Sequence, residues 1–170
     1  FTTPYGYGGW IVEGENKDEL FDVYEKWCTE NRIVCEFVRF HPVLNNVEFS
    51  ADAYDVIPLG HTVTLDITSP EIIWANIPSK SRSVIRKAEK SGVEIFISND
   101  VSVYKDFKEI YNKTMEHDQA KEYYFFGDEF YESVCRDLTD EAAVFYAVKD
   151  QKIIAASIML AAGDKLNYHL

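Results

Sequence analysis

The chain of 170 residues contains no run of eighteen or more apolar residues, the length that a membrane-spanning helix requires. It also shows no positively charged leader followed by an apolar core, so the sequence predicts a cytoplasmic protein. Its three cysteines form no Cys-x-x-Cys motif and have no zinc-ligand spacing. We therefore expect Cys28, Cys35 and Cys135 to be reduced thiols, and we expect no metal site.

Positive charge is scarce, with 17 Lys and Arg against 29 Asp and Glu and a formal net charge of −12. A chain this acidic is a poor nonspecific ligand for nucleic acid. One stretch, residues 80–93 (KSRSVIRKAEKSGV), runs against this balance because it holds five cations and one acid. It is positive by four, and the rest of the chain sums to −16. Such a local cluster is a candidate site for a phosphate or carboxylate ligand.

As a helix, residues 79–91 would place Arg82, Arg86 and Lys90 on one stripe, opposite an apolar face. The basic stripe could bind an anion. It could equally be a solvated surface whose cations are favoured near a helix C-terminus. Both readings remain open from the residues alone.

No Ser/His/Asp or Cys/His set appears, and the sequence indicates no catalytic base. Of the four histidines, His41 is the best candidate for a site because it follows Arg39 in a loop at a predicted strand end. Tyr5 and Tyr7 flank the first glycines of the chain, in a structural turn or a loop that lines a substrate. Tyr123 and Tyr124 belong to a run of four consecutive aromatic residues. Such a run predicts side chains of the hydrophobic core, the wall of a groove, or a stacking platform for a base or sugar.

Apolar periodicity and turn residues predict two groups of elements. The first has a strand at 10–12, a helix over 16–30 and strands over 33–40, 53–59 and 61–67. Ser69, Pro70 and Glu71 then mark a helix start, so a boundary is expected between Asp66 and Glu71. The second group has helices over 70–76 and 79–91, a strand over 93–98, helices over 101–117 and 127–138, and strands over 142–149, 152–161 and 165–170.

Several of these segments resemble one family. They are residues 4–9 (PYGYGG), 39–45 (RFHPVLN), Trp74 with 80–93, and 111–115 (YNKTM) followed by 123–125 (YYF). Together they are similar to the Fem family, the aminoacyltransferases of peptidoglycan bridge formation within the Gcn5-related acyltransferase superfamily. The resemblance extends over nearly the whole chain.

The resemblance implies an α/β (α+β) fold, with an acyltransferase-like mixed sheet flanked by helices. It implies parts of two tandem domains: residues 1–66 as the C-terminal part of the first and 67–170 as the N-terminal part of the second. A long helical hairpin that holds transfer RNA in some members is absent from this sequence. A lysine implicated in catalysis in the family would lie beyond Leu170, so we expect this chain alone to be inactive.

The implied function is transfer of an acyl or aminoacyl group to an amine of a lipid-linked or nucleotide-linked cell-wall precursor, at the inner face of the membrane. The donor would be aminoacyl-tRNA, with no cofactor and no binding of duplex DNA. The basic residues Arg39, Arg82 and Arg86 are candidates for binding the precursor's diphosphate. With them we expect these substrate-binding residues: Tyr5, Tyr7, His41, Tyr123 and Tyr124.

Two alternatives remain. The first is an N-acetyltransferase that uses acetyl-coenzyme A to modify a sugar or amine, although no Gln/Arg-x-x-Gly-x-Gly/Ala loop opens a helix in this sequence. The second is a non-catalytic domain that binds an anionic glycan or a protein partner.

Overall fold

The computed structural model describes residues 1–3, 6–13 and 17–170. The chain divides into two compact units, unit 1 over Phe1–Leu65 and unit 2 over Asp66–Leu170. The predicted combination of helices with a sheet is confirmed, and the sheet lies in unit 2 with its four strands antiparallel.

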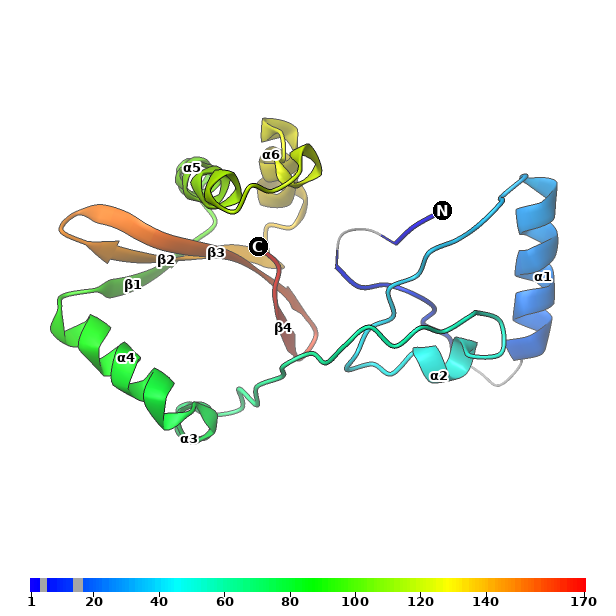
Figure 1. Cartoon of the computed structure of the whole chain (residues 1–170), viewed down its shortest axis with the longest axis horizontal. Coiled ribbons are helices and arrows are strands. Elements are labelled where there is room, and N and C mark those ends of the chain that lie inside the picture. Colours follow the sequence, from blue (N-terminus) through cyan, green and yellow to red (C-terminus); the bar gives the residue numbers. More distant parts are fainter. Residues whose placement is uncertain (4–5, 14–16) are drawn as a thin grey trace. The chain divides into compact units, whose positions relative to one another are not determined.

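The helices and strands of unit 2 follow the order that the sequence predicts, with one short 3-10 helix added. Its helical segments are α3 (Pro70–Asn76), α4 (Ser79–Lys90), α5 (Val101–His117), the short 3-10 helix η1 (Glu122–Tyr124) and α6 (Asp128–Asp137). Its strands are β1 (Glu94–Ser98), β2 (Ala142–Lys149), β3 (Lys152–Ala162) and β4 (Lys165–Tyr168). They form one sheet in the order β1-β2-β3-β4. Figure 1 shows α5 and α6 on one side of this sheet.

Local signals account for the ends of several elements. Pro70 stands at the start of α3, and the Oγ of Ser69 accepts a hydrogen bond from the Ile72 amide at 3.2 Å. This cap satisfies one amide that the first helical turn leaves unpaired. After α4, Gly92 has φ of +82°, a conformation that glycine adopts without a steric penalty. The helix therefore ends where the sequence predicts, and β1 follows.

Strands β2 and β3 are joined by a two-residue turn. Asp150 and Gln151 have φ of 49° and 61°, and Lys149 pairs with Lys152 across the turn. Positive φ at both central residues is the geometry of a type I′ turn, which matches the twist of the two strands. The ladder then shifts register near Ala147 and Val148, a β-bulge that kinks the hairpin.

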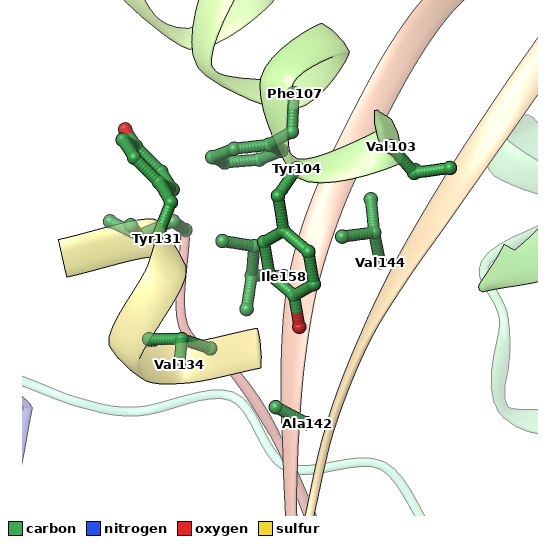
Figure 2. Close-up of a cluster of buried hydrophobic side chains, with 9 residues drawn as sticks. Val103, Tyr104, Phe107, Tyr131, Val134, Ala142, Val144 and Ile158 are labelled. Carbon is green, nitrogen blue, oxygen red and sulfur yellow. The ribbon is translucent and has the colours of Figure 1, made fainter. Parts of the chain in front are cut away.

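The core of unit 2 lies between α5, α6 and the central strands (Figure 2). Tyr104 and Phe107 of α5 are each 2% exposed, and Val144 of β2 and Ile158 of β3 are fully buried. Alternation along a strand sends every second side chain to the helix-covered face. The other core members are Val103, Tyr131, Val134, Ala142 and Leu170.

The opposite face of the sheet is also apolar. Ile95 and Ile97 of the edge strand β1 are 66% and 60% exposed. Between them, Phe96 points to the other face, where its ring stacks on that of Tyr146 with the centroids 5.6 Å apart. The described part of the chain therefore packs one face of the sheet and leaves the other open at β1.

Unit 1 contains α1 (Lys17–Glu30) and α2 (Val47–Ser50). Among the described residues, its extended segments pair at two isolated parallel bridges, Thr2 with Phe37 and Gly8 with Phe40. The strands predicted at 10–12, 33–40, 53–59 and 61–67 are wrong, because the structure assigns no strand to these residues. β-branched and aromatic residues favour a strand only where neighbouring strands are present to pack against. The described part of unit 1 contains no sheet that these segments could join.

Aromatic contacts join α1 to the first residues of the chain. The Trp10 ring meets the rings of Phe21 and Tyr24 edge-on, at 5.7 and 4.8 Å between centroids. Tyr24 in turn stacks against Trp27 at 5.9 Å. Unit 1 is thus packed through contacts between aromatic rings, whereas unit 2 has a core between helices and a sheet.

Candidate functional site

Unit 1 contains a cavity of about 1370 Å³. Three of the predicted site residues line it, namely Tyr7, Arg39 and His41. Pockets that bind small molecules typically measure about 300–1,000 Å³, so this one has room for a ligand larger than a single amino acid.

The loops that carry these residues are tied together by short polar contacts. The Gly8 amide donates to the Arg39 carbonyl at 2.8 Å. The Asn46 side chain donates to the carbonyls of Gly8 and Trp10 at 2.9 and 3.2 Å, and its Oδ1 accepts from the His41 amide at 2.9 Å. One amide side chain therefore holds residues 8–10 against the loop at 41–46.

Gly9 shows why the first of these loops needs glycine. It has φ of +95°, and a Cβ there would lie 2.8 Å from Cδ1 of Phe40 and 2.9 Å from Nδ2 of Asn46. Any side chain would displace one of these neighbours as well as strain the backbone. The close approach of the two segments depends on this residue.

His41 is oriented by its own loop. Its Nδ1 accepts hydrogen bonds from the amides of Val43 and Leu44, both at 3.2 Å, so a chemical role for His41 would use Nε2. The Tyr7 ring lies 5.4 Å from the imidazole, between centroids, and the Tyr7 hydroxyl is 3.2 Å from Oγ1 of Thr62. The structure thus brings Tyr7 and His41 into contact and places Arg39 on the same cavity wall.

A polar cluster that no sequence motif predicted borders the cavity, and Tyr24, Glu36 and Tyr54 of this cluster line the cavity wall. Nε1 of Trp10 donates to the Tyr54 hydroxyl at 2.9 Å, and this hydroxyl donates to Oε2 of Glu36 at 2.8 Å. Tyr24 and Cys28 of α1 line the same cavity. No sequence motif predicts this cluster, because its members come from four separate segments of the chain.

Both phenols of this cluster stay protonated well above neutral pH. Burial first, and then the Glu36 carboxylate, raise the pKa of Tyr54 to about 12, although the bond from Trp10 works the other way. Burial, followed by Cys28 and Glu36, also raises the pKa of Tyr24. Burial disfavours the charged phenolate, and the nearby carboxylate repels it. The Tyr54 hydroxyl therefore acts as a donor to Glu36.

In unit 2, the candidates Arg82 and Arg86 both lie on Trp74 of α3. Nη1 of Arg82 donates to the carbonyls of Trp74 and Ala75 at 3.0 and 3.4 Å. The guanidinium of Arg86 lies 5.1 Å from the centroid of the Trp74 ring, a cation–π contact. Arg82 thus satisfies carbonyls at the end of α3, where a helix leaves them unpaired. Arg86 is exposed and has no such backbone contact among the described residues.

Tyr123 and Tyr124 lie on η1, before α6. Their rings meet edge-on at 5.4 Å, and they are 70% and 38% exposed. Phe126, two residues later, turns inward and stacks on Phe130 at 4.6 Å. The aromatic run is therefore divided between surface and core. Tyr5, the remaining candidate, lies outside the described residues.

Within the described ranges, no group of three His, Cys, Asp or Glu side chains could hold a metal ion. No helix there is both long enough and apolar enough to cross a bilayer. A comparison of the chain with protein-family models and with curated proteins finds no match.

Proposed function

We propose that this chain belongs to a Fem-like acyltransferase of tandem, Gcn5-related domains. The enzyme transfers an acyl or aminoacyl group to an amine of a cell-wall precursor at the inner face of the membrane. The donor is aminoacyl-tRNA in the leading form of this proposal and acetyl-coenzyme A in the alternative form.

One observation carries the proposal. Two segments that resemble the Fem family, residues 4–9 and 39–45, are distant in sequence, and their described parts meet in unit 1, where the Gly8 amide donates to the Arg39 carbonyl at 2.8 Å. Tyr7, Arg39 and His41 of these segments line a single cavity. A shared cavity is what segments that bind one substrate need, whereas unrelated surface loops need none.

The chemistry divides between binding and positioning. Acyl transfer to an amine requires a bound donor, an amine held close to the carbonyl and stabilisation of the oxyanion. Arg39 of unit 1 and Arg86 of unit 2 are exposed guanidinium groups, each of which can bind a phosphate, and Arg82 has one nitrogen committed to the end of α3. In this proposal Arg86 binds phosphate more directly than Arg82 does.

The test is transfer of labelled amino acid from charged transfer RNA to a nucleotide-linked or lipid-linked muropeptide by the full-length protein. A parallel reaction supplies labelled acetyl-coenzyme A. Labelled muropeptide supports the proposal, and absence of label with every amino acid and with the acetyl donor would sink it.

Variants then separate a phosphate site from a solvated surface. Arg86→Ala is expected to raise KM for the precursor about tenfold, the loss of one charge-assisted contact, with a nearly unchanged melting temperature. Arg136→Ala is the matched control, because Arg136 pairs with Asp137 on α6 at 2.7 Å. If the two substitutions change KM equally, the cations of α4 form a solvated surface and do not bind phosphate.

A further inference from the structure

Three lysines of α4 have no role in the proposed function. Lys80, Lys87 and Lys90 are exposed, and none of them forms an ion pair with a described residue. Elsewhere in unit 2, the exposed cations Lys113 and Arg136 pair with an acid of their own helix at 2.6 and 2.7 Å. Helix α4 therefore presents unpaired positive charge on a chain that contains 29 acids.

The spacing of the α4 cations costs the helix stability. Arg82, Arg86 and Lys90 follow one another at intervals of four residues, and Lys87 precedes Lys90 by three. Like charges at these spacings are neighbours on a helix surface and repel each other. A helix whose charges serve only solubility usually alternates their sign along its face. The pattern of α4 is one that an opposite charge outside the helix would stabilise.

Apolar side chains are exposed beside these lysines. Val84 lies on one helical stripe with Lys80 and Lys87, at the spacing i, i+4, i+7, and is 62% exposed. On α3, Ile72 is 38% exposed and Trp74 is partly exposed. Neither helix contains a buried residue, and Figure 1 shows both of them away from α5 and α6. The two helices thus offer positive charge and apolar groups on the same surface.

The exposed apolar groups distinguish between the anions that could meet this surface. A free phosphate or the backbone of a nucleic acid offers charge, and has no use for an exposed valine between two lysines. A bilayer with anionic lipids offers headgroup charge and, directly below it, an apolar layer. Amphipathic helices with Lys and Arg on the polar face lie in that interface, where Trp is also enriched. Clusters of four to eight cations on such a helix bind anionic lipid, and α4 contains five.

The charge of the rest of the chain makes this assignment specific. Outside residues 80–93 the chain sums to −16, so an anionic surface repels it. Interactions between exposed charges are screened over about 8 Å at physiological salt. A membrane in contact with α4 therefore attracts its lysines, while acids farther away contribute little. Any binding of this acidic chain to an anionic membrane has to occur through α4.

We propose that α4, with α3 beside it, docks unit 2 on the anionic surface of a lipid bilayer. Lys80, Lys87 and Lys90 contact the phosphates of the lipid headgroups, and Val84 lies at the boundary with the acyl chains. The inference rests on the proposed function in one respect only, which is that the bilayer is the one that carries the precursor. Arg86 keeps the role in precursor binding that is given above.

The test is flotation of the whole chain with lipid vesicles. One set contains phosphatidylcholine alone, and in the other set one third of the lipid is phosphatidylglycerol. At about 0.1 M salt we expect at least tenfold tighter binding to the anionic vesicles. The binding should be lost near 1 M salt, where charges are screened within about 3 Å. Equal binding to the two sets, or no binding to either, overturns the proposal.

A triple variant locates the binding surface. Lys80→Gln, Lys87→Gln and Lys90→Gln together are expected to weaken binding to the anionic vesicles at least tenfold. The variant should stay folded, as measured by circular dichroism, because it relieves repulsion within α4. Undiminished binding overturns the assignment.

The matched control removes the same charge elsewhere in unit 2. It replaces three exposed lysines outside α4 with glutamine and is expected to bind within about twofold of the wild type. An equal loss in the control would show a general effect of net charge and overturn the assignment. The three residues are Lys105, Lys121 and Lys152.

A gain of binding cannot come from misfolding, so a second variant adds an apolar group. Val84→Trp should strengthen binding to the anionic vesicles severalfold, because Trp favours the membrane interface. Val101→Trp, at a 51% exposed position of α5, should leave binding unchanged. If the two substitutions act alike, Val84 does not meet the bilayer and the proposal is overturned.

Two further outcomes separate this proposal from its alternatives. Binding of a single-stranded RNA oligonucleotide through the three lysines, without binding to vesicles, would assign α4 to nucleic acid and overturn the proposal. Vesicle binding without any acyl transfer keeps the membrane surface and sinks the proposed function. Transfer to a nucleotide-linked muropeptide without vesicle binding keeps the function and overturns the membrane surface.

Discussion

Units 1 and 2 are ordered by different forces. In unit 2, four large side chains from a helix and two strands are 2% exposed or less. In the described part of unit 1, the one buried residue is Ser50, whose hydroxyl donates to the Asn46 carbonyl at 3.2 Å. Apolar burial stabilises a unit as a whole, whereas polar anchors fix individual loops. Unit 2 is therefore expected to be the more stable unit, and unit 1 the better placed to adapt to a ligand.

The largest expected effect comes from the core of unit 2. Phe107→Ala should lower the free energy of unfolding by about 3–5 kcal/mol, because it leaves a cavity between α5 and the sheet. Urea unfolding followed by circular dichroism measures the loss. Ile97→Ala is the control, since that side chain is 60% exposed and should cost roughly 0.5 kcal/mol. Equal costs would contradict a core on only one face of the sheet.

The next effect concerns the polar anchor of unit 1. Asn46→Ala removes three hydrogen bonds, with an expected local cost of about 1–3 kcal/mol. Hydrogen exchange should accelerate over residues 6–13 and 39–46 and stay unchanged in β2 and β3. Asn46→Asp, which keeps an acceptor for the His41 amide, should protect residues 39–46 better than residues 6–13. Uniform acceleration across both units would show that Asn46 is not a local anchor.

A smaller effect distinguishes two neighbouring arginines of unit 2. Arg82→Ala should cost about 1 kcal/mol, because the carbonyls of Trp74 and Ala75 lose a charged donor. Arg86→Ala should cost about 0.5 kcal/mol, the strength of an exposed cation–π contact. Thermal melting compares the two variants. The reverse order would show that Arg82 is available to ligands and that Arg86 is structural.

The smallest effect is a pH dependence confined to unit 2. Burial lowers the pKa of His169 from its ordinary value of 6.5, so the folded unit favours the neutral ring. The stability that His169 contributes is then complete above about pH 6.5 and is lost as the pH falls through the lower folded value. Unfolding midpoints of the wild type and His169→Gln should converge in acid. His61→Gln, on an exposed residue of unit 1, should follow the wild type throughout.

The secondary structure of unit 2 could be predicted from the sequence almost residue by residue. Pro70–Asn76, Val101–His117 and Ala142–Lys149 have the predicted bounds, and the other predicted elements differ by one or two residues, whereas η1 was not predicted. Here the local signals agree with the packing, because the periodic apolar residues of α5 and α6 are the ones that the sheet covers.

Unit 1 could not be predicted in the same way. Its α1 was found, but its predicted strands fail because the order comes from Asn46, from glycine contacts and from ring packing between distant segments. The cavity residues Tyr7, Arg39 and His41 could be chosen from loop position and type. Glu36 and Tyr54 could not, since a hydrogen bond between residues 18 positions apart leaves no local pattern.

The two-residue turn at Asp150 and Gln151 also has a consequence for how unit 2 assembles in time. A hairpin closed by so short a turn pairs residues that are near in sequence, and hairpins form in roughly 1–10 μs. In the sequence, α5 and α6 lie between β1 and β2, so pairing these two strands closes a far longer loop. We therefore expect β2 and β3 to pair first and β1 to join the sheet last. The backbone of β1, including its two isoleucines, then stays without a partner strand for the longest part of folding.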